Sequence, residues 1–272
     1  MLESQTPNAP LVDIGANLVH ESFQHDFDQV IERAKAAGLV HIMVTGTSLE
    51  GAQAALELCQ RDLDYFSFTS GFHPHEASQC TSDAFSAIAE LAAHDKAVAV
   101  GETGLDFNRD YSPRDAQEKA FAKHLELACN INKPMFLHQR DAHARFHPML
   151  KEARDDLKMG GVVHCFTGEK NELFDYLDLD MYIGITGWAC DERRGKHLLE
   201  LIPNIPLDRL LLETDAPYLL PRTIRPKPKS RRNEPCHLQA VLTTVAQVLD
   251  LPEAQIAQQT TQNARNLFGL NF

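Results

Sequence analysis

Four side chains of the kind that bind metal ions each follow a short apolar run of the sequence. Glu102 follows AVAVG, His138 follows PMFL, His164 follows GVV and Asp215 follows LLLET. Two imidazoles and two carboxylates brought together would hold a divalent cation and hydrolyse a substrate beside it. Because they are far apart along the chain, they meet only if these runs are neighbouring parallel strands whose ends share one rim.

The apolar runs themselves predict eight strands. They cover residues 11–15, 41–47, 65–73, 97–106, 134–138, 161–166, 182–187 and 209–215. Most are apolar almost throughout, as expected for strands that are buried on both faces.

Segments with helical periodicity alternate with these runs. They cover residues 26–37, 49–61, 82–94, 113–132, 141–157, 170–178 and 191–201, and two more, 235–249 and 252–268, follow the last strand. This α/β alternation predicts a (β/α)8 TIM barrel, in one domain spanning 1–272. A doubly wound open sheet is the alternative, and it fits less well because no GxGxxG follows the first strand.

Each candidate ligand also has a purely structural interpretation. Glu102 can be a buried glutamate paired with an arginine inside the barrel. His138 and His164 can be packing residues, although two histidines in the same register on consecutive strands favour ligation. Asp215 can be a turn residue before Ala216-Pro217, whereas in a metal-dependent hydrolase it can also take the proton of the attacking water.

Further histidines follow the third strand, in GFHPHE. His73 is a candidate catalytic residue that would orient a phosphate or a leaving group, and His75 would support the site from behind. A polar turn built around Pro74 is the alternative interpretation.

A basic segment, PRTIRPKPKSRRN at 221–233, directly follows the eighth strand. It contains three prolines and no acidic residue, which indicates an extended loop on the same rim. Its cations are candidate substrate ligands: Arg222, Arg225, Lys227, Lys229, Arg231 and Arg232. The neighbouring charges at 191–194 are expected to be a solvated run or a helix start.

The rest of the chain is acidic, with a formal net charge of −12 at pH 7. A polyanionic substrate would therefore have to bind at a focused site and not on a broad basic face. The six cysteines form no CxxC pair and are expected to be free thiols. The opening MLESQTPNAP lacks a signal-peptide pattern, and no apolar run is long enough to span a bilayer, so a cytoplasmic protein is expected.

Seven segments in this order resemble the TatD family of metal-dependent nucleases over nearly the whole chain. They are GFHPH at 71–75, GETGLDF at 101–107, FLHQRDA at 136–142, HCFTG at 164–168, GITGW at 184–188, ETDAPYL at 213–219 and RRNEP at 231–235. CDERRG and the basic segment are most similar to the TatD branch that gives the family its name.

The resemblance implies a TIM barrel of the amidohydrolase type that hydrolyses phosphodiester bonds. It implies Glu102, His138, His164 and Asp215 as ligands of one or two ions of Mg²⁺, with Mn²⁺ or Zn²⁺ as alternatives. For the TatD branch it implies a 3′→5′ exonuclease on single-stranded DNA and RNA that takes part in repair of oxidative DNA damage. We also expect Trp188 or Phe107 to stack a terminal base, Asn233 and Glu234 to brace the site, and the protein to be a monomer.

The first strand departs from the family pattern. Most relatives have a His-x-His pair at its end, where this chain has Gly15 and Asn17. The amide oxygen of Asn17 suits Mg²⁺ better than Zn²⁺. The departure puts a permanently bound second metal in doubt.

Two other functions remain open from the residues alone. One is an amidohydrolase that acts on a small cyclic amide or ester, for which a neutral substrate would leave the basic segment without a purpose. The other is a metal-stabilised barrel that binds a partner without catalysis.

Overall fold

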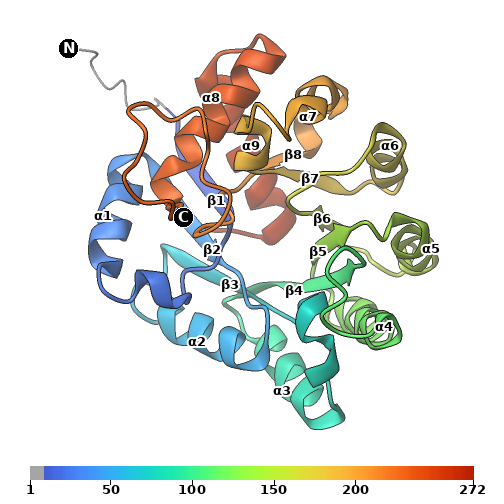
Figure 1. Ribbon diagram of the computed structural model, residues 1–272. Helices are drawn as coiled ribbons and strands as arrows, with labels where there is room; N and C mark the ends of the chain where they lie inside the picture. The colour runs from blue at the N-terminus through green and yellow to red at the C-terminus, as the bar shows by residue number, and fades with distance from the viewer. Residues whose placement is uncertain (1–8) are drawn as a thin grey trace.

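The structure is a computed structural model that describes residues 9–272. Its eight strands form one parallel sheet in the order β1 to β8, which confirms the predicted (β/α)8 barrel (Figure 1). The strands are β1 (Leu11–Ala16), β2 (Leu39–Val44), β3 (Phe66–Ser70), β4 (Ala97–Asp106), β5 (Met135–Arg140), β6 (Gly161–Val163), β7 (Tyr182–Ile185) and β8 (Leu210–Leu212).

The helices lie outside the ring of strands (Figure 1). They are α1 (Phe27–Ala36), α2 (Leu49–Cys59), α3 (Ser82–Ala93), α4 (Arg114–Ile131), α5 (His143–Ala153), α6 (Lys170–Asp178), α7 (Lys196–Leu201), α8 (Leu238–Leu249) and α9 (Glu253–Phe268). Local sequence fixes several of their ends, because Ser48 and Thr81 accept hydrogen bonds from the first turns of α2 and α3.

Two apolar clusters hold the barrel together. The larger one fills the space between the strands and the surrounding helices. The smaller one includes Val12, Met43 and Phe136 from the strands and is joined by Leu267 and Phe268 of α9. Truncating a fully buried phenylalanine such as Phe136 typically costs about 3–5 kcal/mol, so this cluster is a rigid base for the rim.

The barrel closes between β1 and the segment that follows β8. Individual backbone hydrogen bonds join them, in place of a regular β-ladder. The Asp215 N–H donates to the carbonyl oxygen of Gly15 at 2.8 Å, and the Asn17 N–H donates to that of Ala216 at 2.7 Å. Closure therefore places Asp215 beside the end of β1.

Five strands, β2, β3, β6, β7 and β8, end earlier than the sequence predicts, and the ends of β6 and β8 matter most for the rim. The apolar pattern continued β6 to residue 166 and β8 to residue 215, but they end at Val163 and Leu212. Cys165 and Asp215 adopt positive φ angles of 45° and 54°, which no strand accommodates. The chain thus bends inward at the points where His164 and Asp215 leave the strands.

Strand β4 approaches β5 more closely than a side chain would allow. Gly104 has φ +145°, and a Cβ atom there would collide with the carbonyl oxygen of His138. Only glycine fits this conformation, so the GETG sequence brings the ends of β4 and β5 together.

The predicted helix at 191–201 is shorter in the structure. A 3₁₀ helix, η3 (Gly187–Cys190), comes first, and α7 begins only at Lys196. Asp191 is buried and accepts hydrogen bonds from Arg193 and Arg194. The other three residues of the charge run are exposed, as expected for a solvated run.

Two further expectations concern the thiols and the membrane. All six cysteines are free, as predicted. None of the helices within residues 9–272 combines the length and the apolar character that crossing a bilayer requires. Residues 1–8 of the opening segment lie outside the described part of the chain.

Candidate active site

The carboxylate of Glu102 is the centre of the rim, although β4 continues beyond this residue to Asp106. Its Oε1 atom lies 2.7 Å from Nε2 of His164, 2.9 Å from Nδ1 of His138 and 3.4 Å from Nε2 of His73. His138 lies within β5, His164 directly follows β6, and His73 lies in the turn after β3. Three nitrogen atoms therefore share one oxygen, which has only two lone pairs.

Contacts of the second ring nitrogen orient the imidazoles of His73 and His164. Nδ1 of His73 accepts a hydrogen bond from the His75 N–H at the start of η2 (Pro74–Gln79), which turns Nε2 toward Glu102. Nδ1 of His164 lies 3.3 Å from Oε2 of Glu213. Partners of this kind fix ring orientation in metal sites.

Asp106 is a second buried carboxylate at this rim. Its Oδ2 atom lies 2.8 Å from Nε2 of His75 and 3.4 Å from Nε2 of His138. Its Oδ1 atom accepts the N–H groups of Asn108 and Arg109 at 3.0 Å. Although burial alone would raise its pKa, the nearby imidazoles of His138 and His75 and the hydrogen bond from the Arg109 N–H hold the pKa of Asp106 well below its usual range.

Asp215 lies on the β1 side of the same rim. The side-chain amide of Asn17 donates to its Oδ1 atom at 3.0 Å. Burial, together with the nearby charges of Glu102 and Glu213, raises the pKa of Asp215 to about 7, although His164 acts in the opposite direction. The carboxyl group is therefore poised between its two protonation states near neutral pH.

Several observations indicate that the residues of this rim suit a divalent cation. Nε2 of His138 is buried, and within residues 9–272 its one polar contact is the 3.4 Å approach to Oδ2 of Asp106, which is too poorly aligned for a hydrogen bond. A buried nitrogen left in this state is rare unless it serves a ligand. Ligand atoms of His73, Glu102 and His138 lie within 4.8 Å of one another.

The charges of the rim also favour a cation. Burial lowers the pKa of a histidine, yet Glu102 and Glu213 raise the pKa of His164 well above its usual value. A pocket that pulls protons onto a fully buried imidazole would equally stabilise a bound metal ion.

The structure thus brings most of the predicted metal ligands together at the rim. Glu102, His138 and His164 lie together. His73 also belongs to this group, since its Nε2 atom lies 3.4 Å from Oε1 of Glu102, whereas the sequence predicted only that it orients a phosphate. Asp215 accepts a hydrogen bond from Asn17 and lies near enough to His164 and Glu102 for their charges to shift its pKa. Sequence reasoning missed Asp106 and Glu213, although both lie within motifs, GETGLDF and ETDAPYL, that it quoted.

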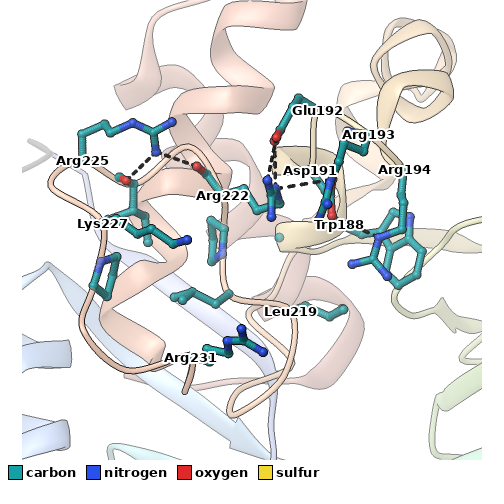
Figure 2. Close-up of a pocket in the computed structure, with 15 residues that line it drawn as sticks. Trp188, Asp191, Glu192, Arg193, Arg194, Leu219, Arg222, Arg225, Lys227 and Arg231 are labelled. Carbon is teal, nitrogen blue, oxygen red and sulfur yellow. Dashed lines mark hydrogen bonds and ion pairs between the residues drawn. The ribbon is translucent and has the colours of Figure 1, made fainter.

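The basic segment borders a pocket of about 680 Å³ on the same side of β8. Figure 2 shows Arg222, Arg225, Lys227 and Arg231 on one side of it and Trp188 with the charge run at 191–194 on the other. Part of its wall is formed by Leu219 to Arg222, which begin four residues after Asp215 in the sequence.

The six cations of this segment differ in their partners. Arg222 makes two hydrogen bonds to the carboxylate of Glu192, and Arg225 donates to the carbonyl oxygens of Arg222 and Ile224 (Figure 2). Arg232 is paired with Asp26 at 2.7 Å and with Glu234 at 2.8 Å, which ties the segment to α1.

The remaining cations of the segment are exposed, and among residues 9–272 they, like Arg225, have no carboxylate partner. Within residues 9–272, no carboxylate oxygen lies within 4.0 Å of Lys227, Lys229 or Arg231. These three are the cations with most charge to offer a ligand.

Arginine side chains cover both aromatic rings on which a base was expected to stack. The guanidinium of Arg194 lies 4.4 Å from the ring centre of Trp188, and that of Arg114 lies 4.3 Å from the ring centre of Phe107. Stacking of a base on either ring stays a prediction, since an arginine would have to move or stack on the far side.

Asn233 and Glu234 lie at the end of the basic segment. Asn233 is fully buried and donates to the carbonyl oxygen of Thr214 at 2.9 Å, next to Asp215. Glu234 accepts two hydrogen bonds from Arg33 of α1. Together they anchor the segment on both sides of the rim.

The chain is similar to known proteins over nearly its whole length. The model of one family, TatD related DNase, matches residues 12–269. A Citrobacter koseri protein named 3′-5′ ssDNA/RNA exonuclease TatD is 48% identical over 262 residues, which cover 96% of this chain and 100% of that protein. A protein of the same name from Cronobacter turicensis is 50% identical over 258 residues, or 95% of this chain and 97% of that one.

A solved structure is similar in its fold. It is the hydrolase TatD family protein from Entamoeba histolytica, which is 26% identical and superimposes with a TM-score of 0.87. The match covers 97% of this chain and 99% of that chain.

A substitution tests whether Asp106 orients the histidines that bind the metal. We expect Asp106→Asn to weaken Mn²⁺ binding about 10–100-fold, because the carboxylate no longer orients His75 and His138. Titration calorimetry of the metal-free protein with Mn²⁺ measures this. Asp110→Asn is the matched control, since Asp110 is exposed and pairs only with Arg114. Equal Mn²⁺ affinities in the wild type and both variants would contradict the assignment.

Proposed function

The chain belongs to the family of TatD related DNases, hydrolases of phosphodiester bonds, and from this premise we propose that it is a metal-dependent 3′→5′ exonuclease of single-stranded DNA and RNA. The observation that carries the proposal is the convergence of His73, His138 and His164 on Glu102 at the rim of the barrel. The names of the relatives from Citrobacter koseri and Cronobacter turicensis support the polarity and the substrate.

We propose Glu102, His138, His164 and Asp215 as the residues that hold one or two divalent cations, with His73 beside them. Carboxylates suit Mg²⁺ or Mn²⁺ and imidazoles suit Zn²⁺, so the donor set accepts each of them. When bound, the cation supplies charge neutralisation at the phosphate and a lowered pKa for water.

The protein's own groups then have separate tasks. Asp215 accepts the proton of the attacking water as a general base, because its carboxylate lies at the rim, held there by the side-chain amide of Asn17. Nε2 of His73 lies at the edge of the Glu102 group and orients the phosphate. The strand is held by Lys227, Lys229 and Arg231, while Arg222, Arg225 and Arg232 shape the loop that presents them.

A monomeric state, a cytoplasmic location and a role in DNA repair stay predictions for this activity. They do not affect its test, which needs only the isolated chain.

The direct test is digestion of a 5′-labelled single-stranded oligonucleotide. With Mg²⁺ or Mn²⁺ we expect a ladder that shortens from the 3′ end, and no ladder with EDTA or with Glu102→Ala. Asp215→Asn should lower the rate about 10²–10⁴-fold, the usual contribution of a general base. Undiminished cleavage by folded Asp215→Asn would refute its role. No cleavage by folded wild type would favour an amidohydrolase.

The proposed strand-binding cations predict a specific salt dependence. For single strands, the logarithm of the binding constant falls with the logarithm of salt concentration by about 0.7 per contacted phosphate. Replacing Lys227, Lys229 and Arg231 by glutamine should therefore reduce the slope by about 2, as measured by fluorescence anisotropy of a labelled oligonucleotide.

The control for this measurement has the same net charge. It replaces Lys119, Lys151 and Lys158, which are exposed and lie outside the basic segment, by glutamine. Its slope should equal that of the wild type. If both triple variants lowered the slope equally, only general charge and not this pocket would bind the strand.

A further inference from the structure

A second cluster of metal-ligand side chains lies on the outer helices, away from the rim group. His143 and His147 are four residues apart on α5, which places them on the same helix face, and Asp175 faces them from α6. Ligand atoms of the three residues lie within 4.8 Å of one another. The two imidazole rings are stacked, with ring centres 5.4 Å apart and an interplanar angle of 13°.

The ring of His143 is held in a fixed orientation. Its Nε2 atom lies 2.8 Å from Oδ2 of Asp175, and its Nδ1 atom lies 2.9 Å from the hydroxyl of Tyr176. That buried hydroxyl also accepts a hydrogen bond from the side-chain amide of Gln139 at 2.8 Å. Metal-binding histidines are commonly fixed in this way through their second nitrogen.

The hydroxyl of Tyr176 accommodates either tautomer of His143, because it can donate or accept. When Nε2 carries the proton, it faces Asp175. When a cation takes Nε2, the proton resides on Nδ1 and faces the tyrosine oxygen. The change needs no movement of the ring.

The state and exposure of the other ligands are also suitable. Burial and the proximity of His143 lower the pKa of His147, despite Asp175, so its imidazole is neutral and ready to coordinate at neutral pH. The Asp175 side chain is 41% exposed and that of His143 is 14% exposed. A cation can therefore reach the cluster from solvent.

We propose that His143, His147 and Asp175 form a second metal site, for Zn²⁺ or a similar late divalent transition ion. Two imidazole nitrogens and one carboxylate oxygen match the preferences of Zn²⁺ and not those of Mg²⁺. The ion would join α5 to α6, the helices that follow the strands bearing His138 and His164. The site is independent of the proposed nuclease activity.

Zinc stoichiometry tests this proposal. In equilibrium dialysis with Zn²⁺ alone, we expect His147→Gln and Asp175→Asn each to bind one ion fewer per chain than the wild type. Glu102→Ala, which alters only the rim, should retain the outer ion, and His147→Gln combined with Glu102→Ala should lose it. Cleavage of the oligonucleotide with Mg²⁺ should be unchanged in His147→Gln.

Unfolding provides a second measurement that does not depend on counting ions. Zn²⁺ should raise the urea midpoint of Glu102→Ala, since an ion that binds only the folded state stabilises it. The increase should be absent from the double variant with His147→Gln. Equal zinc binding and equal shifts with and without His147, in variants whose circular dichroism matches the wild type, would show that the cluster is only a hydrogen-bonded contact.

Discussion

The arrangement of the rim depends on one buried carboxylate that faces three imidazoles. Glu102 is 5% exposed, and burial alone would raise its pKa, yet the histidines around it hold the pKa well below the usual range. A charged glutamate at this depth needs such partners. The close approach of β4 and β5 at Gly104, the inward bend after β6 and the turn after β3 all serve to deliver those imidazoles to one oxygen atom.

The order of strands and the identity of the central residues could be predicted because both depend on local pattern. Apolar runs that end in Glu102, His138 and His164 imply a shared rim once a parallel barrel is assumed. Asp106 could not be assigned in that way, since its contacts with His75 and His138 arise from the register between β4 and its neighbours. The partners of Arg232 were equally hidden, because Asp26 lies 206 residues away along the chain.

The first strand illustrates how a departure from a family pattern is accommodated. A Cβ atom at Gly15 would lie 2.6 Å from Oε2 of Glu213, so the buried carboxylate occupies space beside the strand. Asn17 meanwhile holds Asp215 through its amide. In this chain the end of β1 thus supports the carboxylates that follow β8 and offers no imidazole of its own to a cation.

The central claim is that the group around Glu102 is a metal centre. Crystals soaked in Mn²⁺ and measured at the manganese absorption edge would test it most directly. The account predicts an anomalous peak within bonding distance of Glu102 and His138, absent from crystals of Glu102→Ala. A well-ordered wild-type rim without such a peak, with the imidazoles still hydrogen-bonded to Glu102, would contradict it.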